Sequence, residues 1–324
     1  QQALQWWAGS REIEMARERY LAIVFRSARP PHAPRHYYYG YYGNQLPAQV
    51  LQDALEISVK RSDRAHASYL VAMNQRLQGG DPSQVRRTTE TFEAALEATR
   101  STEWYDDTLY HYAEWLTGAG KIIPLEGGGY QQQPDYVRAV EILRRLLTDF
   151  DKGDTRYHDQ AKDRIDHSTE PSLGVAVTNI FLPGSEIQYH LNWRNVEEIQ
   201  LALYPVDLTR DLKLSRDDRR SGWLRGLSSA AASPVREWTH RPDEAKDHVP
   251  KNETLILANP LSSGAYLLRA SGGGQVAHEL VLVTRLSLVL KASASKVLVY
   301  ACDAVDGSPV AGTDVALWVR RHDG

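Results

Sequence analysis

The sequence predicts a multidomain chain that is helical in its first half and built from β-strands in its second half. Up to about Ser168 the apolar residues recur every three or four positions, which is the spacing of one helix face. After Thr169-Glu170-Pro171 they alternate with polar residues, as in strands that bury one face. The length of 324 residues exceeds one ordinary core and suits two or three domains.

Composition and charge narrow the class of protein. Hydrophobic residues make up 42% and charged residues 24%, close to the averages for folded globular chains. The net charge of -3 provides no positive field for a phosphate backbone, so we expect no nucleic-acid partner. No apolar run reaches the roughly 20 residues of a membrane helix, so no membrane anchor is visible in this chain. A single cysteine, Cys302, excludes an internal disulfide.

Helical periodicity predicts seven helices in a helical-repeat region, 1–170. They are expected at 11–27, 48–60, 64–77, 84–99, about 105–116, 135–150, and in a partner segment that carries Tyr157, Ala161 and Ile165. The clearest, 135–150, has an apolar stripe formed by Val137, Val140, Leu143, Leu147 and Phe150. Such short helices in series are typical of stacked antiparallel repeats.

Alternating residues predict seven strands in 171–284, at 173–178, 187–193, 199–203, 235–240, 254–257, 265–270 and 277–283. This is the size and pattern of an immunoglobulin-like or fibronectin-like β-sandwich. Three more strands, at 286–292, 296–305 and 313–320, would begin a second sandwich in 285–324. Because three strands alone leave an apolar face and an edge in water, we expect further chain after Gly324, and also before Gln1, which is not a methionine.

Several segments, in this order, resemble the macroglobulin-type domain of bacterial α2-macroglobulin-like proteins. They are Phe-Leu-Pro-Gly-Ser-Glu at 181–186, Asn-Trp-Arg-Asn-Val at 192–196, Leu-Ala-Leu-Tyr-Pro-Val-Asp-Leu at 201–208, the glycine-led strand at 264–268 and Val-Leu-Val-Tyr-Ala-Cys-Asp at 297–303. In the helical region, small Ala139 and Ala161 beside Tyr136, Phe150 and Tyr157 resemble a tetratricopeptide unit. The resemblance implies that this chain is the N-terminal fragment of a macroglobulin-like protein.

The same resemblance implies a function and a location for the whole protein. It would inhibit endopeptidases by offering a bait segment and capturing the protease through a thioester, and it would be extracytoplasmic: periplasmic, in the cell envelope or secreted. The thioester motif Cys-x-Glu-Gln is not matched, because Cys302 is followed by Asp303, Ala304 and Val305. Proteases would therefore bind parts outside this chain, while this part is structural and contacts an unidentified protein through its helices.

No catalytic, cofactor-binding or metal-binding residue is predicted, so we expect no enzyme and no cofactor. Cys302 shares a predicted strand face with Leu298 and Tyr300 and is expected to be buried there. Asp163 and His167 lie four apart on a helix, but two ligands make no metal site. A hydrolase with accessory sandwiches would need a catalytic domain outside this chain.

An alternative is a surface binding scaffold that recognises a peptide or glycan and is unrelated to protease trapping. The tyrosine-rich run 36–42 is the candidate interaction surface, through Tyr38, Tyr39, Tyr41 and Tyr42, because flat amphipathic rings bind at low entropic cost. Packing between helices is the favoured explanation of this run.

Overall fold

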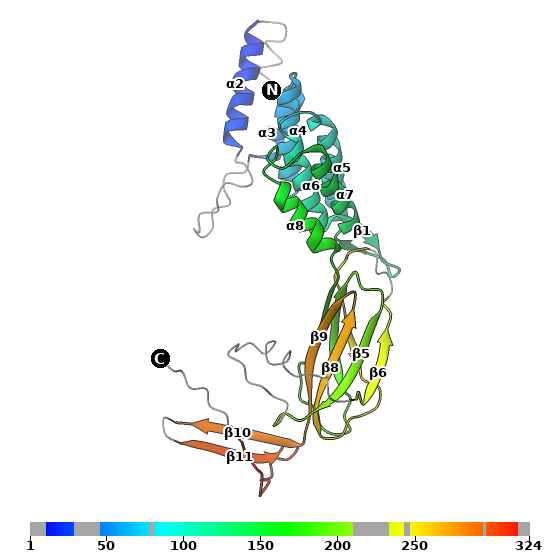
Figure 1. The fold of residues 1–324 in the computed structure, drawn as a ribbon. Helices are drawn as coiled ribbons and strands as arrows, with labels where there is room; N and C mark the ends of the chain where they lie inside the picture. Colours follow the sequence, from blue (N-terminus) through cyan, green and yellow to red (C-terminus); the bar gives the residue numbers. More distant parts are fainter. Residues whose placement is uncertain are drawn as a thin grey trace. The chain divides into compact units, whose positions relative to one another are not determined.

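The structure, a computed structural model, describes residues 11–28, 46–77, 81–209, 233–242, 247–293 and 296–316. The chain divides into two compact units. One comprises Gln1–Glu170 with Asp247–Val249, and the other comprises Pro171–Lys246 with Pro250–Gly324. The described helices belong to the first unit, and most of the described strands belong to the second (Figure 1).

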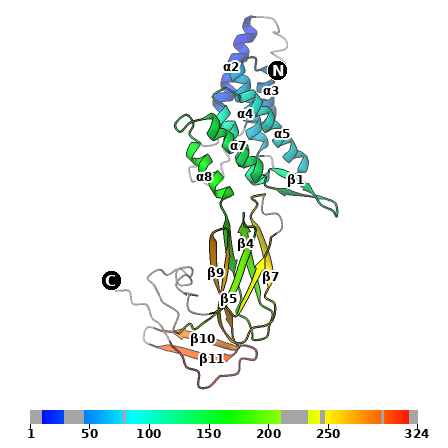
Figure 2. The same cartoon turned by 45° about the vertical axis from the view of Figure 1, so that its right-hand side comes forward.

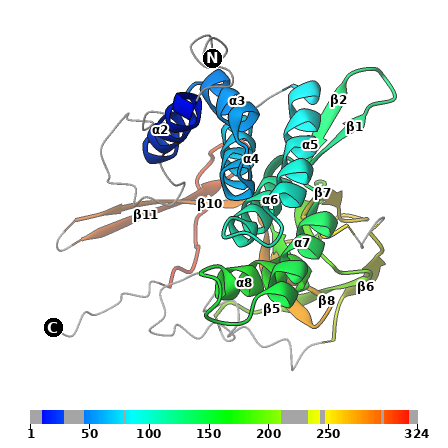
Figure 3. The ribbon, with the colours of Figure 1, turned by 90° about the horizontal axis from the view of Figure 1, so that it is seen from above.

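The structure describes seven helices in the first unit, and each corresponds to a predicted helix with ends shifted by a few residues. They are α2 (Arg11–Ser27), α3 (Ala48–Ile57), α4 (Arg61–Gln75), α5 (Pro82–Thr99), α6 (Tyr105–Ala119), α7 (Tyr136–Asp149) and α8 (His158–Thr169). Each helix packs against the next one along the chain, and Figure 3 shows α3, α4 and α5 side by side. The prediction of short helices in series is confirmed.

Aspartate side chains start two of these helices. Asp81 accepts a hydrogen bond from the backbone N–H of Gln84 at 2.9 Å, and Pro82 occupies the first helical position of α5. Asp135 accepts in the same way from Arg138 at the start of α7. These caps satisfy backbone donors that have no partner within the helix, which contributes about 1 kcal/mol each.

The helical unit contains two hydrophobic clusters that meet on α4. The first joins α2, α3 and α4 through Leu21, Val24, Leu51, Tyr69 and their neighbours. The second joins α4 to α8 and includes Phe92, Leu109, Tyr112, Leu143 and Tyr157. Met73 of α4 packs against both clusters.

The apolar face of α7 differs from the predicted stripe. Val137 is 42% exposed, whereas Ala139 and Leu146, which the stripe omitted, are fully buried. The reason is that α7 packs against both α6 and α8, so its buried face is wider than the stripe one neighbour would cover. Ala139, Ala161 and Tyr157 all lie in the same cluster.

A β-hairpin between α6 and α7 was not predicted. Its strands β1 (Lys121–Pro124) and β2 (Tyr130–Gln133) pair antiparallel. Ile122 packs against the second cluster, while Tyr130 is 49% exposed. The run of three glutamines in β2 has little intrinsic preference for strands, so the sequence pattern gave no strand signal there.

Seven strands of the second unit form two antiparallel sheets over one core. The strands β3 (Ser172–Ala176), β4 (Gln188–Arg194) and β7 (Lys251–Ile256) form one sheet in the order β3-β4-β7. The other has the order β6-β5-β8-β9, from β5 (Ile199–Val206), β6 (Arg236–His240), β8 (Gly264–Gly272) and β9 (Gln275–Val283). Figures 1 and 2 show the two layers. All seven strands were predicted.

The core of this unit lies between the two sheets. In β4 the alternating Tyr189, Leu191 and Trp193 are buried, and in β5 the alternating Ile199, Leu201 and Leu203 are buried. Both sets belong to one hydrophobic cluster. The two-residue period read from the sequence therefore gave the correct inward face.

A separate antiparallel hairpin follows, formed by β10 (Leu286–Ala292) and β11 (Val297–Asp303). Residues 313–316, the described part of the strand predicted at 313–320, are not in a strand, so that prediction is wrong over these positions. Within the described part of the chain the hairpin has no third strand. Its side chains Leu288, Leu290 and Leu298 are more than half exposed.

Candidate functional site

The residues singled out from the sequence do not gather into one site. Tyr38, Tyr39, Tyr41 and Tyr42 lie outside the described residues. Asp163 and His167 are both exposed on α8. Among the described residues, no group of three or more His, Cys, Asp or Glu side chains is placed to hold a metal ion.

Cys302 is buried, as predicted, with 8% of its surface exposed. Its Sγ lies 3.8 Å from the backbone oxygen of Ser287 on the paired strand. Leu298 and Tyr300, which share its strand face, are 62% and 43% exposed. A face of two strands covers its side chains only where another element packs on it.

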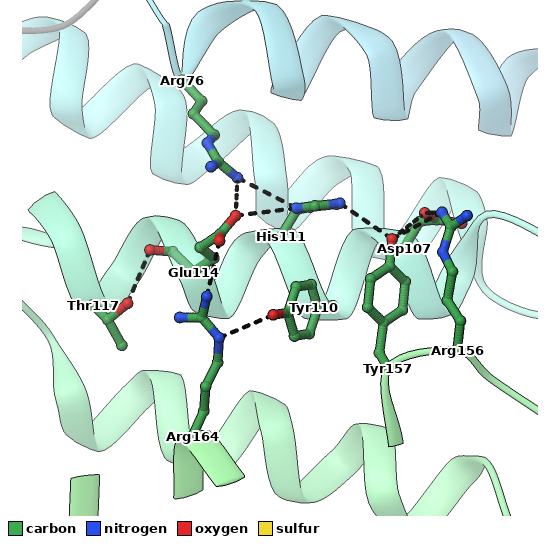
Figure 4. Close-up of polar contacts among 9 residues, drawn as sticks. All are labelled: Arg76, Asp107, Tyr110, His111, Glu114, Thr117, Arg156, Tyr157 and Arg164. Atoms are coloured by element: carbon green, nitrogen blue, oxygen red, sulfur yellow. Dashed lines mark hydrogen bonds and ion pairs between the residues drawn. The ribbon is translucent and has the colours of Figure 1, made fainter. Parts of the chain in front are cut away.

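A chain of polar side chains crosses the interior of the helical unit (Figure 4). Glu114 of α6 lies at its centre. One of its carboxylate oxygens pairs with the guanidinium group of Arg76, at the end of α4, at 2.7 Å. Its other oxygen accepts from Arg164 of α8 at 2.9 Å. His111 Nδ1 lies 3.2 Å from Glu114. The hydrogen bond to His111, with the two guanidinium groups, lowers the pKa of Glu114 to about 2, so this carboxylate is charged at neutral pH.

The same chain continues to Asp107, in the first turn of α6. Asp107 is only 7% exposed and accepts a hydrogen bond from the Tyr157 hydroxyl at 2.7 Å. It also pairs with the Arg156 guanidinium. The Tyr157 oxygen lies 3.3 Å from His111 Nε2. This contact connects the polar side chains around Glu114 with those around Asp107. Burial, followed by the neighbouring Asp107, raises the pKa of Tyr157, so its hydroxyl keeps its proton.

Aromatic rings complete this interior. The rings of Tyr110 and Tyr157 stack with centroids 4.2 Å apart. The guanidinium groups of Arg164 and Arg156 lie over these two rings, at 5.2 Å and 4.9 Å. A carboxylate held ionised, a tyrosine held protonated and stacked cations form a polar core that joins α4, α6 and α8. We name Arg76, Asp107, Tyr110, His111, Glu114, Arg156, Tyr157 and Arg164 the polar chain.

A second aromatic stack fixes a histidine near α2. The imidazole of His66 lies between the rings of Phe25 and Trp104, with centroid distances of 4.1 Å and 3.7 Å. Burial lowers the pKa of His66 to about 4. Its ring is therefore neutral at physiological pH and serves here as an aromatic packing group.

A hollow of about 230 Å³ lies between α3, α4 and α5. Its lining is mostly polar and includes five carboxamide side chains: Gln49, Gln52, Asn74, Gln75 and Gln84. The other lining residues are Ala48, Leu51, Val71 and Arg87. We call it the amide hollow. Carboxamides both donate and accept hydrogen bonds, so its walls are chemically suited to a ligand with both kinds of group.

Four of the five segments that resemble a macroglobulin-type domain occupy turns and core strands of the two-sheet unit, and the fifth, 297–303, is β11 of the separate hairpin. Phe181 is buried, and its backbone bonds Leu282 and Thr284 at the end of β9. Gly184 and Asn195 have positive φ angles of 81° and 54°, which suit glycine and asparagine in turns. Gly264 begins β8. These residues therefore lie in turns and at strand ends of the two-sheet unit.

Sequence reasoning missed the polar chain and the amide hollow. The spacing of His111 and Glu114 was a usable signal, because side chains three apart meet on a helix. A similar signal was the pair Gln84 and Arg87. No spacing rule could pair Glu114 with Arg76 or Arg164, since these lie on other helices.

Comparison with known proteins gives only distant structural likeness. No family model matches the chain, and no curated protein matches it. A solved structure of native α2-macroglobulin from Escherichia coli spanning domains MG0-NIE-MG1 is similar with a TM-score of 0.30 and 17% identity, over 44% of this chain and 48% of that chain. This chain thus spans about half of that structure.

Two further solved structures are matched by this chain over most of their own length. The CARDB domain of the PF1109 protein from Pyrococcus furiosus, in complex with di-metal ions, has a TM-score of 0.20, 14% identity, and coverage of 36% of this chain and 88% of that chain. BslA, a bacterial hydrophobin, has a TM-score of 0.20, 16% identity, and coverage of 36% and 98%. Likeness at this level establishes no shared function. None of the described helices has the length and apolarity to cross a membrane.

Proposed function

We propose that this chain is a structural, protein-interacting segment of an extracytoplasmic protein similar to bacterial α2-macroglobulins, and that it performs no catalysis of its own. The observation that carries the proposal is the order of the resembling segments along one two-sheet domain. The segments at 181–186, 192–196 and 201–208 and the glycine-led strand after Gly264 supply its turns and core strands in that order. On this proposal the seven strands form an immunoglobulin-like macroglobulin domain.

The proposal extends to the rest of the chain. The β10–β11 hairpin would open a second macroglobulin-type domain, which is supported by its exposed leucines and valines, since such side chains are normally covered. The helices would form tetratricopeptide-like repeats, which is supported by the buried Ala139, Ala161 and Tyr157 in one cluster. These repeats would contact a protein partner, and nucleic acid is not expected.

The role proposed for the whole protein is inhibition of endopeptidases by trapping. The test uses the full protein that contains this chain, incubated with an endopeptidase. Trapping predicts that cleavage of a large protein substrate falls while cleavage of a short peptide substrate persists, because a trapped protease still admits small molecules. Equal cleavage of both substrates with and without the protein would overturn the inhibitor role.

A second candidate is a surface scaffold that binds a peptide or glycan. The amide hollow favours it, because a concave polar site on stacked helices suits recognition of an extended ligand. Specific binding by a full protein that leaves endopeptidases unaffected would support the scaffold over the trap.

A further inference from the structure

The floor and walls of the amide hollow differ in chemistry. Leu51 and Val71 are 4% and 7% exposed and form an apolar floor between α3 and α4. The polar side chains stand around them on three helices, three residues apart on α3 and α5 and adjacent in sequence on α4. Most small-ligand sites have a predominantly apolar lining, so this largely polar lining favours a ligand rich in hydrogen-bonding groups.

Several wall groups are not committed to the protein itself. Within the described part of the chain, the carboxamides of Gln84 and Gln52 make no hydrogen bond, and Gln84 Nε2 is buried without a partner. Gln75 uses its oxygen to accept from Thr91 at 2.7 Å, and Gln49 uses its nitrogen to donate to Asp53 at 2.8 Å. A buried amide without a partner destabilises the protein, and a ligand that pairs with it would remove that cost.

The charge of the hollow comes from one arginine. Arg87 is exposed on α5, and among the described residues it forms no ion pair with an acid. No acid lines the hollow. Two carboxylates that neighbour lining residues in the sequence have hydrogen-bond donors of their own, since Asp81 accepts from Ser83 and the Gln84 backbone and Asp53 accepts from Gln49. The hydrogen bond from Ser83 lowers the pKa of Asp81, and Arg87 also contributes to lowering it. A ligand that places a carboxylate beside Arg87 would gain a charge-assisted, bidentate interaction.

We propose that the amide hollow binds a short, extended peptide segment that carries a carboxylate. The four glutamine carboxamides pair with backbone N–H and C=O groups, which alternate along an extended chain, and Arg87 pairs with the acid. The Asn74 amide is already engaged, since its Nδ2 donates to the Leu46 oxygen at 3.2 Å. None of the nine lining residues is aromatic, so the hollow offers no ring for a sugar face to stack on. Its volume equals that of about eight waters at ~30 Å³ each, so it takes only a short segment.

This inference gives a ligand class to the protein-interacting role proposed above and rests on that role. It does not depend on protease trapping, because the peptide assay below involves no protease. A failed trapping assay and a failed peptide assay are therefore distinguishable.

The test measures fluorescence anisotropy of a labelled alanine–glutamate peptide titrated with the full chain. Matched peptides replace glutamate by glutamine or by lysine. We expect the glutamate peptide to bind, the glutamine peptide to bind about tenfold more weakly, and the lysine peptide not to bind. The variant Arg87→Gln should weaken binding of the glutamate peptide about tenfold or more, as for loss of one charge-assisted hydrogen bond.

Arg86→Gln is the matched control, because Arg86 is the neighbouring exposed arginine on α5 and does not line the hollow. It should leave the affinity unchanged, while Gln84→Leu should weaken binding of both the glutamate and the glutamine peptide. The proposal is overturned if no glutamate peptide binds, if Arg86→Gln and Arg87→Gln weaken binding equally, or if free glutamate at the same concentration displaces the peptide. The last result would indicate a site for small acids.

Discussion

The hydroxyl of Tyr157 donates a hydrogen bond to Asp107 across 2.7 Å, although the two residues are 50 positions apart in the chain. Asp107 lies in the first turn of α6, and Tyr157 is the N-cap residue of α8. This bond therefore fixes the start of one helix against the start of another. Because Asp107 is almost fully buried, the groups that pair with it contribute strongly to the helical unit.

Tyr157→Phe should destabilise the helical unit by about 1–2 kcal/mol, since it removes a donor from a buried carboxylate while keeping the stacked ring. Urea unfolding followed by far-ultraviolet circular dichroism measures this change. Tyr130→Phe is the control, because Tyr130 is 49% exposed and surface changes of this kind cost within about 0.5 kcal/mol. Equal effects of both variants would contradict a special role for the Asp107 bond.

Glu114 should make the helical unit acid-sensitive between pH 4.5 and pH 2. Its pKa falls from 4.5 in the unfolded chain to about 2 in the folded unit, so its contribution is present above pH 4.5 and is lost as pH falls through 2. The contribution is about 2 kcal/mol after allowance for partial solvent screening. Unfolding free energies measured across this window should show the loss.

Glu114→Gln should flatten that dependence and lower stability at neutral pH, because Arg76 and Arg164 then face a neutral amide. Glu141→Gln is a suitable control, since among the described residues Glu141 forms an exposed ion pair with Arg138, which contributes little to stability. An unchanged slope in Glu114→Gln would show that other carboxylates carry the acid sensitivity.

His66 should titrate far below an ordinary histidine. Burial lowers its pKa from 6.5 to about 4, so the unfolded chain binds the proton more readily and stability falls as pH drops from 6.5 towards 4. The imidazole signal in a proton NMR titration should show its midpoint near 4. His66→Phe keeps an aromatic ring between Phe25 and Trp104 and should remove the stability loss in this window; a midpoint near 6.5 would contradict the stacked arrangement.

Gly272→Ala should destabilise the two-sheet unit by about 1–3 kcal/mol, the usual cost of overpacking. An added Cβ would lie 2.5 Å from the backbone oxygen of Glu198 and 2.8 Å from Val196. Hydrogen exchange with mass spectrometry should show faster exchange in β5 and β8. Gly118→Ala in α6 is the counterpart, because its Cβ meets nothing within 4 Å, and it should slow exchange in α6, since alanine favours the helix.

The sequence predicted most of the elements, because their signals are local. The alternation of Ile199, Leu201 and Leu203 defined both a strand and its inward face, and all three are buried. The stripe on α7 was less successful at Val137, since the sequence does not state how many neighbours a helix will have. The β1–β2 hairpin was not predicted, because a glutamine-rich strand has no alternation of apolar and polar residues.

The candidate sites were much less predictable. The aromatic run at 36–42 drew attention because it is contiguous, whereas the polar chain draws its members from α4, α6 and α8. The amide hollow is similar, since Gln52, Gln75 and Arg87 come from three helices. Contacts of this kind depend on tertiary packing, which single-residue spacing does not encode.

The two hydrophobic clusters that meet on α4 divide the described helices into two blocks, and each block is expected to unfold cooperatively. Cooperative blocks of this kind open with different free energies. The block of α2 and α3 has the smaller cluster and meets the larger block through α4 and through Trp104 at the start of α6, so it should be the first to open. The walls of the amide hollow come from α3, α4 and α5, and thus from both blocks. A ligand bound in the amide hollow would stabilise the closed state of the block of α2 and α3 by mass action. Binding there would therefore also order helices that the ligand does not contact.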